Sequence, residues 1–163
     1  MRAEKAIRAQ LAIDLDLEWK QDGPVVIPLP NGAKPEIDAV SLDGRTLVEI
    51  YAHQGPLKGG QVHKVARDAL KLITVAQKVP ALQGSSAKLY VAFASEAAAD
   101  SASRGWLGEA FDLWGIKRQV VRIPDDVRRE LEGAQERQRM VNATGEDELS
   151  GDALPVTATG ALS

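Results

Sequence analysis

An Asp-Gly dipeptide, Asp43-Gly44, separates two runs of residues that favour β-strands, 37–42 and 46–51. Asp-Gly readily adopts the positive φ angles of a tight turn, and between two β-rich runs it is the strongest short-range signal for a β-hairpin. We therefore predict a hairpin over these residues. The prediction constrains the whole fold, because a hairpin is stable only when other segments pack on it or extend it into a sheet.

The rest of the chain alternates between helical and strand patterns. Apolar residues recur at helical spacing in four segments, and short β-rich runs lie between these segments. The predicted helices span residues 2–17, 61–78, 103–114 and 124 to about 140, and the predicted strands outside the hairpin span 25–27, 88–94 and 119–123. The first three strands are close enough in sequence to pair antiparallel, whereas the later ones follow helical crossovers. The order predicts an α/β fold with a mixed central sheet flanked by helices.

Composition sets wider limits. Residues 1–141 suffice for a single domain with its own core, and residues 142–163 are mostly polar and small, so we predict a disordered tail there. The chain has no cysteine and no apolar run of about 18 residues that could span a bilayer. We predict a cytoplasmic protein without a membrane partner. The net charge of −3 argues mildly against a nucleic-acid binder that relies on overall positive charge.

Two acidic residues stand on the predicted hairpin, Asp38 on its first strand and Glu49 on its second. Paired strands place such residues opposite one another when the register allows it. Two neighbouring carboxylates repel unless a cation compensates their charge, and oxygen ligands of this kind suit Mg²⁺ or Mn²⁺. The pair therefore predicts a site for a divalent cation, which could polarise a phosphate and activate water.

The helix predicted after the hairpin has one polar face, formed by Gln61, Lys64, Asp68 and Lys71. Positions three, seven and ten residues apart share a side of a helix. One interpretation is an ordinary solvated face. The other is that Gln61 and Lys64, in the first turns of the helix, lie over the hairpin and reach the cation site.

The order of elements, Asp38 followed eleven residues later by Glu49, and the Gln- and Lys-bearing helix together resemble the PD-(D/E)XK nuclease superfamily. The resemblance implies a restriction-endonuclease-like fold and a Mg²⁺- or Mn²⁺-dependent endonuclease that hydrolyses phosphodiester bonds of DNA, with RNA left open. It also implies that Asp38 and Glu49 bind the metal. An acid in the first helix often joins them in this superfamily, and Glu4 is the matching residue.

The chain departs from the superfamily pattern at Tyr51, which stands where a lysine would activate water and stabilise charge. If the site is active, the resemblance implies that Lys64 or Lys58 supplies the lysine and that Gln61 orients the water or a phosphate oxygen. Otherwise the chain is a nuclease-fold protein without catalysis that binds nucleic acid or a protein. A third interpretation is an accessory subunit of a larger nuclease. A core of this size would need a homodimer or a complex to cut both strands.

Overall fold

The computed structural model describes residues 2–83 and 87–149. A four-stranded sheet of order β3-β4-β5-β6 forms its centre. The strands are β3 (Ala39–Val40), β4 (Thr46–Tyr51), β5 (Lys88–Phe93) and β6 (Ile116–Val120). β3 and β4 are antiparallel, and β4, β5 and β6 are parallel. The predicted α/β class with a mixed sheet is confirmed, and so is the hairpin, because Gly44 turns between β3 and β4 with a φ of 74°.

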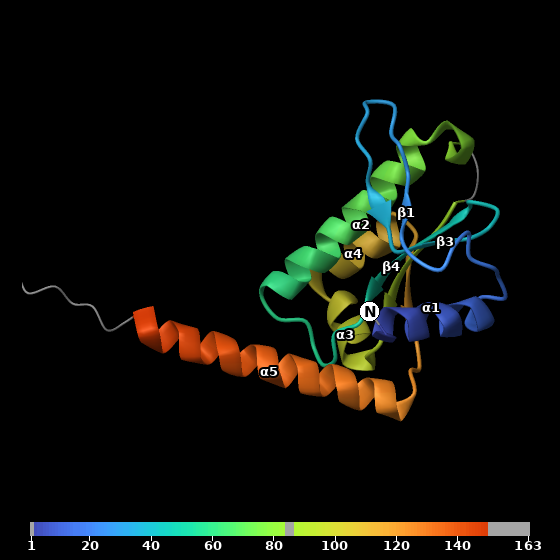
Figure 1. The fold of residues 1–163 in the computed structure, drawn as a ribbon. Helices are drawn as coiled ribbons and strands as arrows, with labels where there is room; N and C mark the ends of the chain where they lie inside the picture. Colours follow the sequence, from blue (N-terminus) through green and yellow to red (C-terminus); the bar gives the residue numbers. More distant parts are fainter. Residues whose placement is uncertain (1, 84–86, 150–163) are drawn as a thin grey trace, which may run out of the picture.

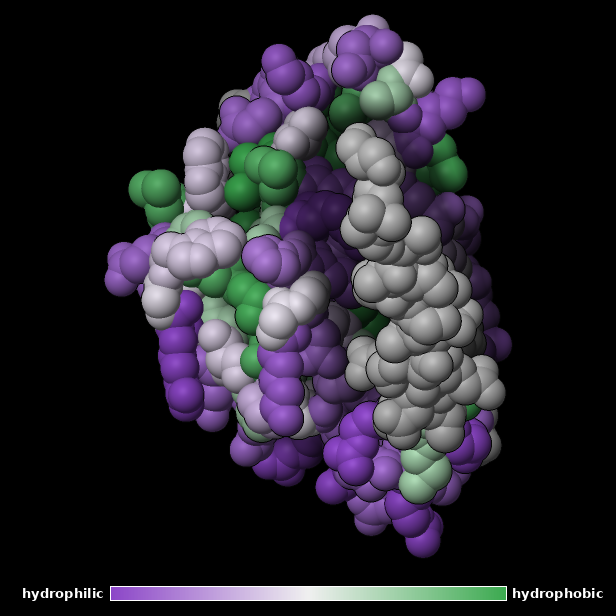
Figure 2. Space-filling model, turned by 90° about the vertical axis from the view of Figure 1, so that its left-hand side faces the viewer, coloured by the Kyte–Doolittle hydropathy of each residue, from purple (hydrophilic) through white to green (hydrophobic). Residues whose placement is uncertain are grey.

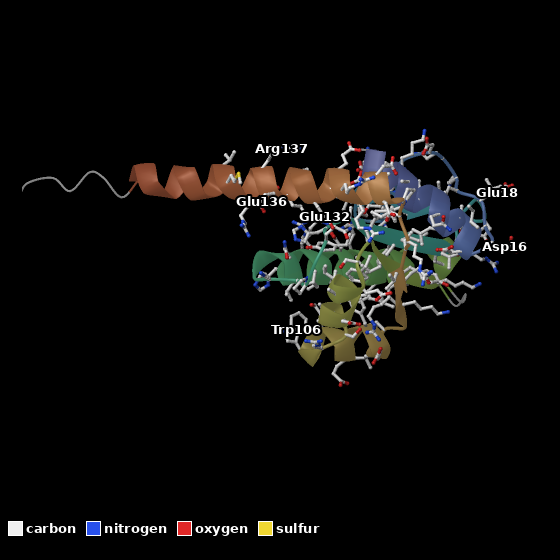
Figure 3. The ribbon with its side chains drawn as sticks, turned by 90° about the horizontal axis from the view of Figure 1, so that it is seen from below. Asp16, Glu18, Trp106, Glu132, Glu136 and Arg137 are labelled. Atoms are coloured by element: carbon white, nitrogen blue, oxygen red, sulfur yellow. The ribbon has the colours of Figure 1, made fainter. Side chains whose placement is uncertain are left out.

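Helices cover both faces of this sheet (Figure 1). They are α1 (Arg2–Asp14), α2 (Gly60–Lys78), the 3₁₀ turn η1 (Pro80–Leu82), α3 (Glu96–Ala102), α4 (Gly105–Leu113) and α5 (Asp125–Leu149). Figure 3 shows α1 and α5 on one side of the sheet, with α2, α3 and α4 on the other. Each face therefore has its own apolar core.

The side chains of β4 alternate between the two cores, as in any regular strand. Leu47 and Tyr51 belong to the core beneath α2, whereas Val48 and Ile50 belong to the core beneath α1. All six residues of β4 are buried. Glu49 has the same parity as Leu47 and Tyr51, so the strand directs its carboxylate towards α2.

The first strand of the predicted hairpin is interrupted at Asp38. Before it, β2 (Glu36–Ile37) pairs antiparallel with β1 (Val25–Val26) in a separate two-stranded sheet. After it, β3 joins the central sheet by pairing Ala39 with Val48. The early strands thus form two antiparallel pairs, β1 with β2 and β3 with β4. The bend at Asp38 separates the two sheets to which these pairs belong.

Several boundaries differ from the prediction. α1 ends at Asp14 and not at 17, and Asp16 takes a φ of 49°, outside right-handed helix. The predicted helix 103–114 is α4 alone, and α3 precedes it over an alanine-rich segment. β6 begins at Ile116 and not at 119, because Gly115 with a φ of 64° ends the turn after α4 and the chain then pairs with β5 at once.

α5 extends beyond the expected end near residue 140 and runs to Leu149. α5 thus includes residues 142–149, where the sequence predicted the start of a disordered tail. The remainder of that tail, 150–163, lies outside the described residues. Within the described part of the chain, none of the helices is long and apolar enough to cross a membrane.

Candidate active site

The structure brings Asp38 and Glu49, hereafter the acid pair, to the same place. Oδ2 of Asp38 accepts a hydrogen bond of 2.8 Å from the backbone N–H of Ile50, the residue after Glu49. The side chain of Asp38 thus takes the place of a strand partner at the point where the β2–β3 segment bends. From the other side of the bend, Nε of Arg8 donates to the Asp38 carbonyl at 3.2 Å. Backbone contacts therefore hold Asp38 beside Glu49.

Glu49 is the buried member of the acid pair, with 2% of its surface exposed. Burial, followed by the charge of Asp38, raises the pKa of Glu49 to about 8, against the opposing effect of Lys71. Nζ of Lys71 lies 2.8 Å from Oε1 of Glu49. The contact is an ion pair, although its geometry is not that of a regular hydrogen bond to Oε1.

A second buried acid, Asp68, joins the group from α2. Its surface is 6% exposed, and Nζ of Lys64 lies 2.7 Å from its Oδ2. Its Oδ1 lies 3.9 Å from Nζ of Lys71 and 3.9 Å from Nε of Arg67. Asp68 therefore holds Lys64 and Lys71 along one side of α2, and Lys71 contacts both Asp68 and Glu49.

The lysine beside the acid pair is therefore Lys71 and not Lys64 or Lys58. Lys64 contacts Asp68, and its ammonium lies 5.7 Å from the centre of the Tyr51 ring. Lys58 is exposed in the loop before α2. The sequence does contain a signal for the missed residues, since Asp68 is the one acid of α2 and Lys71 follows it by three positions on the same face.

Gln61 does not lie at the acid pair. Its Oε1 accepts from the backbone N–H of Lys58 at 2.9 Å, and its Nε2 contacts Nε2 of His53 at 2.9 Å. These contacts place it in a cleft of about 680 Å³ between the loop after β4, the start of α2, and α5. Figure 3 shows Glu132 and Glu136, which line this cleft, on α5.

Glu4 lies in the first turn of α1, whose buried residues pack against the face of the sheet opposite to Glu49, and its role as a metal ligand stays a prediction. Among residues 2–83 and 87–149, no three Asp, Glu or His side chains are grouped closely enough to hold a metal ion. The site therefore offers two neighbouring carboxylates, Asp38 at the bend between β2 and β3 and Glu49 on β4.

Tyr51, at the position where the superfamily has lysine, is buried between two rings. Its ring centre lies 5.9 Å from that of Phe93 and 5.9 Å from that of His53. Burial raises the pKa of the Tyr51 hydroxyl to about 12. A hydroxyl with that pKa stays protonated near neutral pH and cannot serve as a base there.

His53 links the loop after β4 to α2 and α5. The Gln61 amide nitrogen contacts His53 Nε2 at 2.9 Å, and the Gln135 amide nitrogen of α5 contacts Nδ1. A neutral imidazole has one donor and one acceptor nitrogen, so one amide can donate to the ring and the other must turn its oxygen towards the ring N–H. Burial lowers the pKa of His53, which favours this neutral form. The structure favours a neutral, structural histidine.

We expect His53 to make the fold less stable as the pH falls from 8 to 5. The pKa is lowered in the folded chain, so the unfolded chain takes up the proton first, from its ordinary value near 6.5 downwards. His53→Asn keeps a donor and an acceptor but does not titrate. In urea unfolding at several pH values, the free energy of unfolding of the variant should therefore rise relative to that of the wild type as the pH falls to 5. A constant difference between the two proteins would contradict the assignment.

Comparisons of this chain with protein-family models, with curated proteins and with solved structures gave no match.

Proposed function

We propose that this protein is a metal-dependent phosphodiester hydrolase of the PD-(D/E)XK type that acts on DNA. The observation that carries the proposal is the buried Glu49 beside Asp38, with Lys71 at 2.8 Å from its carboxylate. Buried acids with a strongly shifted pKa and a specific charged partner are typical of functional sites. Lys71 supplies from the following helix the positive charge that Tyr51 does not.

The donor atoms suit Mg²⁺ or Mn²⁺. Mg²⁺ commonly uses one or two carboxylates together with water and substrate phosphate, so the acid pair is a sufficient protein contribution. Oε1 of Glu49 faces the Lys71 ammonium at 2.8 Å, so a cation bound by this carboxylate would share it with Lys71. A divalent cation held by Asp38 and Glu49 would polarise the scissile phosphate and lower the pKa of a bound water.

The other residues of the site act through position and charge. The Ile50 N–H holds the Asp38 carboxylate beside β4, and Asp68 keeps the Lys71 ammonium next to Glu49. Lys71 would stabilise the negative charge that develops on the phosphate during attack by water. Lys64, one turn before Asp68, would contact the substrate backbone.

The competing proposal is a nuclease-fold protein without catalysis, which binds nucleic acid or a protein, or serves a larger complex. It is favoured by one observation: the ion pair between Lys71 and Glu49 already compensates the buried acid and holds α2 on the sheet. In either case we propose a cytoplasmic location, and a homodimer or a complex wherever both strands of a duplex are cut.

Nicking of supercoiled plasmid with Mg²⁺ or Mn²⁺ separates these proposals. We expect the full chain to nick DNA, and Asp38→Asn to lose the activity, because asparagine can still accept from Ile50 but brings no charge to the site. Glu36→Gln is the matched control, since Glu36 is an exposed acid on β2 two residues away. Equal nicking by wild type and Asp38→Asn would overturn the assignment, and a folded wild type without nicking would favour the non-catalytic proposal.

A further inference from the structure

α2 carries far more positive than negative charge, although the whole chain has a net charge of −3. Four cationic residues and one acid lie along it. The cationic residues, hereafter the α2 cation row, are Lys64, Arg67, Lys71 and Lys78. The acid is Asp68, which is buried and contacts three members of the row. α2 itself therefore carries four positive charges and one negative charge, and Glu49 of β4 adds a second carboxylate beside Lys71.

The α2 cation row is a line and not a scatter. At 3.6 residues per turn its four positions fall within an arc of about 60°, and from Lys64 to Lys78 it extends roughly 21 Å along the helix. The side chains of Lys64 and Arg67 are 47% and 74% exposed, so they reach solvent in spite of their contacts with Asp68. The acid pair lies beside the middle of the line, where Lys71 contacts Glu49.

The other long helix has a different charge pattern. On α5 two of the arginines pair with acids one turn away, Arg128 with Asp125 and Arg139 with Glu136. Such i, i+3 pairs are typical of a solvated surface. Figure 2, which views the molecule from the end where α2 begins, shows more hydrophilic than hydrophobic side chains on the part of this face that is not grey.

We propose that the α2 cation row is the surface that binds the phosphate backbone of a polynucleotide and guides it past the acid pair. The inference rests on the proposed function, because it places the substrate of that site. A polynucleotide presents regularly spaced negative charges, and a line of cations neutralises several of them with release of counterions. Arg67 contacts Asp68, and Lys78 lies about two turns beyond Lys71, so we assign both to binding and neither to the chemical step.

Fluorescence anisotropy of the full chain in EDTA tests the proposal, with labelled duplex DNA, single-stranded DNA and duplex RNA of one sequence as probes. We expect Arg67→Gln/Lys78→Gln to weaken binding at low salt at least about tenfold. The slope of log K against log [salt] should fall by about 1.8 for duplex DNA, or about 1.4 for a single strand, since each phosphate contact contributes roughly 0.9 or 0.7. The probe bound most tightly identifies the kind of polynucleotide.

The matched control is Arg128→Gln/Arg129→Gln on α5, which removes the same charge from a helix with balanced pairs. Its slope should equal that of the wild type, and circular dichroism should show both variants folded. No binding of any probe, or an equal loss of slope in both double variants, overturns the inference. Plasmid nicking is measured separately. If the wild type nicks DNA but Arg67→Gln/Lys78→Gln keeps the wild-type salt slope, only this inference is overturned. If the double variant loses slope but the wild type does not nick DNA, this inference is supported and the catalytic proposal is overturned.

Discussion

Lys71→Met should reduce plasmid nicking at least about a hundredfold, whereas Lys64→Met should stay within about tenfold of the wild type. Removing one group that stabilises transition-state charge typically costs two to three orders of magnitude in rate. Lys71 is the cation beside Glu49, while Lys64 is held by Asp68 one turn further along α2. Methionine keeps the length and the apolar stem of lysine, so the substitution chiefly removes the charge.

Single-turnover rates at saturating DNA measure this prediction free of binding effects. Lys78→Met is the control, because it removes a charge from the same helix away from the acid pair and should lower affinity without lowering the saturated rate. A larger loss in Lys64→Met than in Lys71→Met would return the catalytic role to Lys64. Thermal unfolding of each variant shows whether a loss of rate reflects a loss of folded protein.

Glu49→Gln should make the fold more stable above neutral pH. The pKa of Glu49 is raised from 4.5 to about 8 in the folded chain. The unfolded chain therefore ionises at Glu49 before the folded chain does. The stability that protonated Glu49 contributes is complete below pH 4.5, where both states are protonated, and is lost as the pH rises through 8. At about 1.4 kcal/mol per unit, the full loss is on the order of 5 kcal/mol. Glutamine does not ionise, so this loss is absent from the variant.

Urea unfolding at pH 5, 7 and 9 in the presence of EDTA measures the effect. The stability of the wild type should fall relative to Glu49→Gln across this range, and the two should converge near pH 5. Asp38→Asn provides a second check: the charge of Asp38 is the second cause of the raised pKa, so its removal should shift the loss to lower pH. A constant difference between wild type and Glu49→Gln from pH 5 to 9 would contradict the burial of an ionisable Glu49.

The elements with strong local signals were predicted closely. The helix expected over 61–78 is α2, observed as Gly60–Lys78, and the strand expected over 88–94 is β5, observed as Lys88–Phe93. Both have a clear period or a continuous apolar run. The errors fall where a local signal is short or absent. The break at Asp38 is an example, since a hydrogen bond to Ile50, twelve residues away, accompanies it.

The candidate site shows the same division. Alternation along β4 and the turn at Gly44 are local properties, so the sequence predicted that Asp38 and Glu49 would be neighbours if the register allowed it. Which residue of α2 meets them depends on how the helix is rotated and shifted on the sheet. Packing of buried residues such as Leu72 and Val75 decides that rotation, and it brings Lys71 to Glu49 while Gln61 faces the cleft under α5.

The sequence by itself determined the α/β class, the hairpin and the two acids on it, because these depend on residue periodicity and turn chemistry within short segments. The tertiary structure alone decided that Glu49 is buried, that Lys71 is its partner and that α1 carries Glu4 on the opposite face. The physical reason is that burial and ion pairing depend on distances between elements. Those distances are set by the packing of whole faces, which no short stretch of sequence specifies.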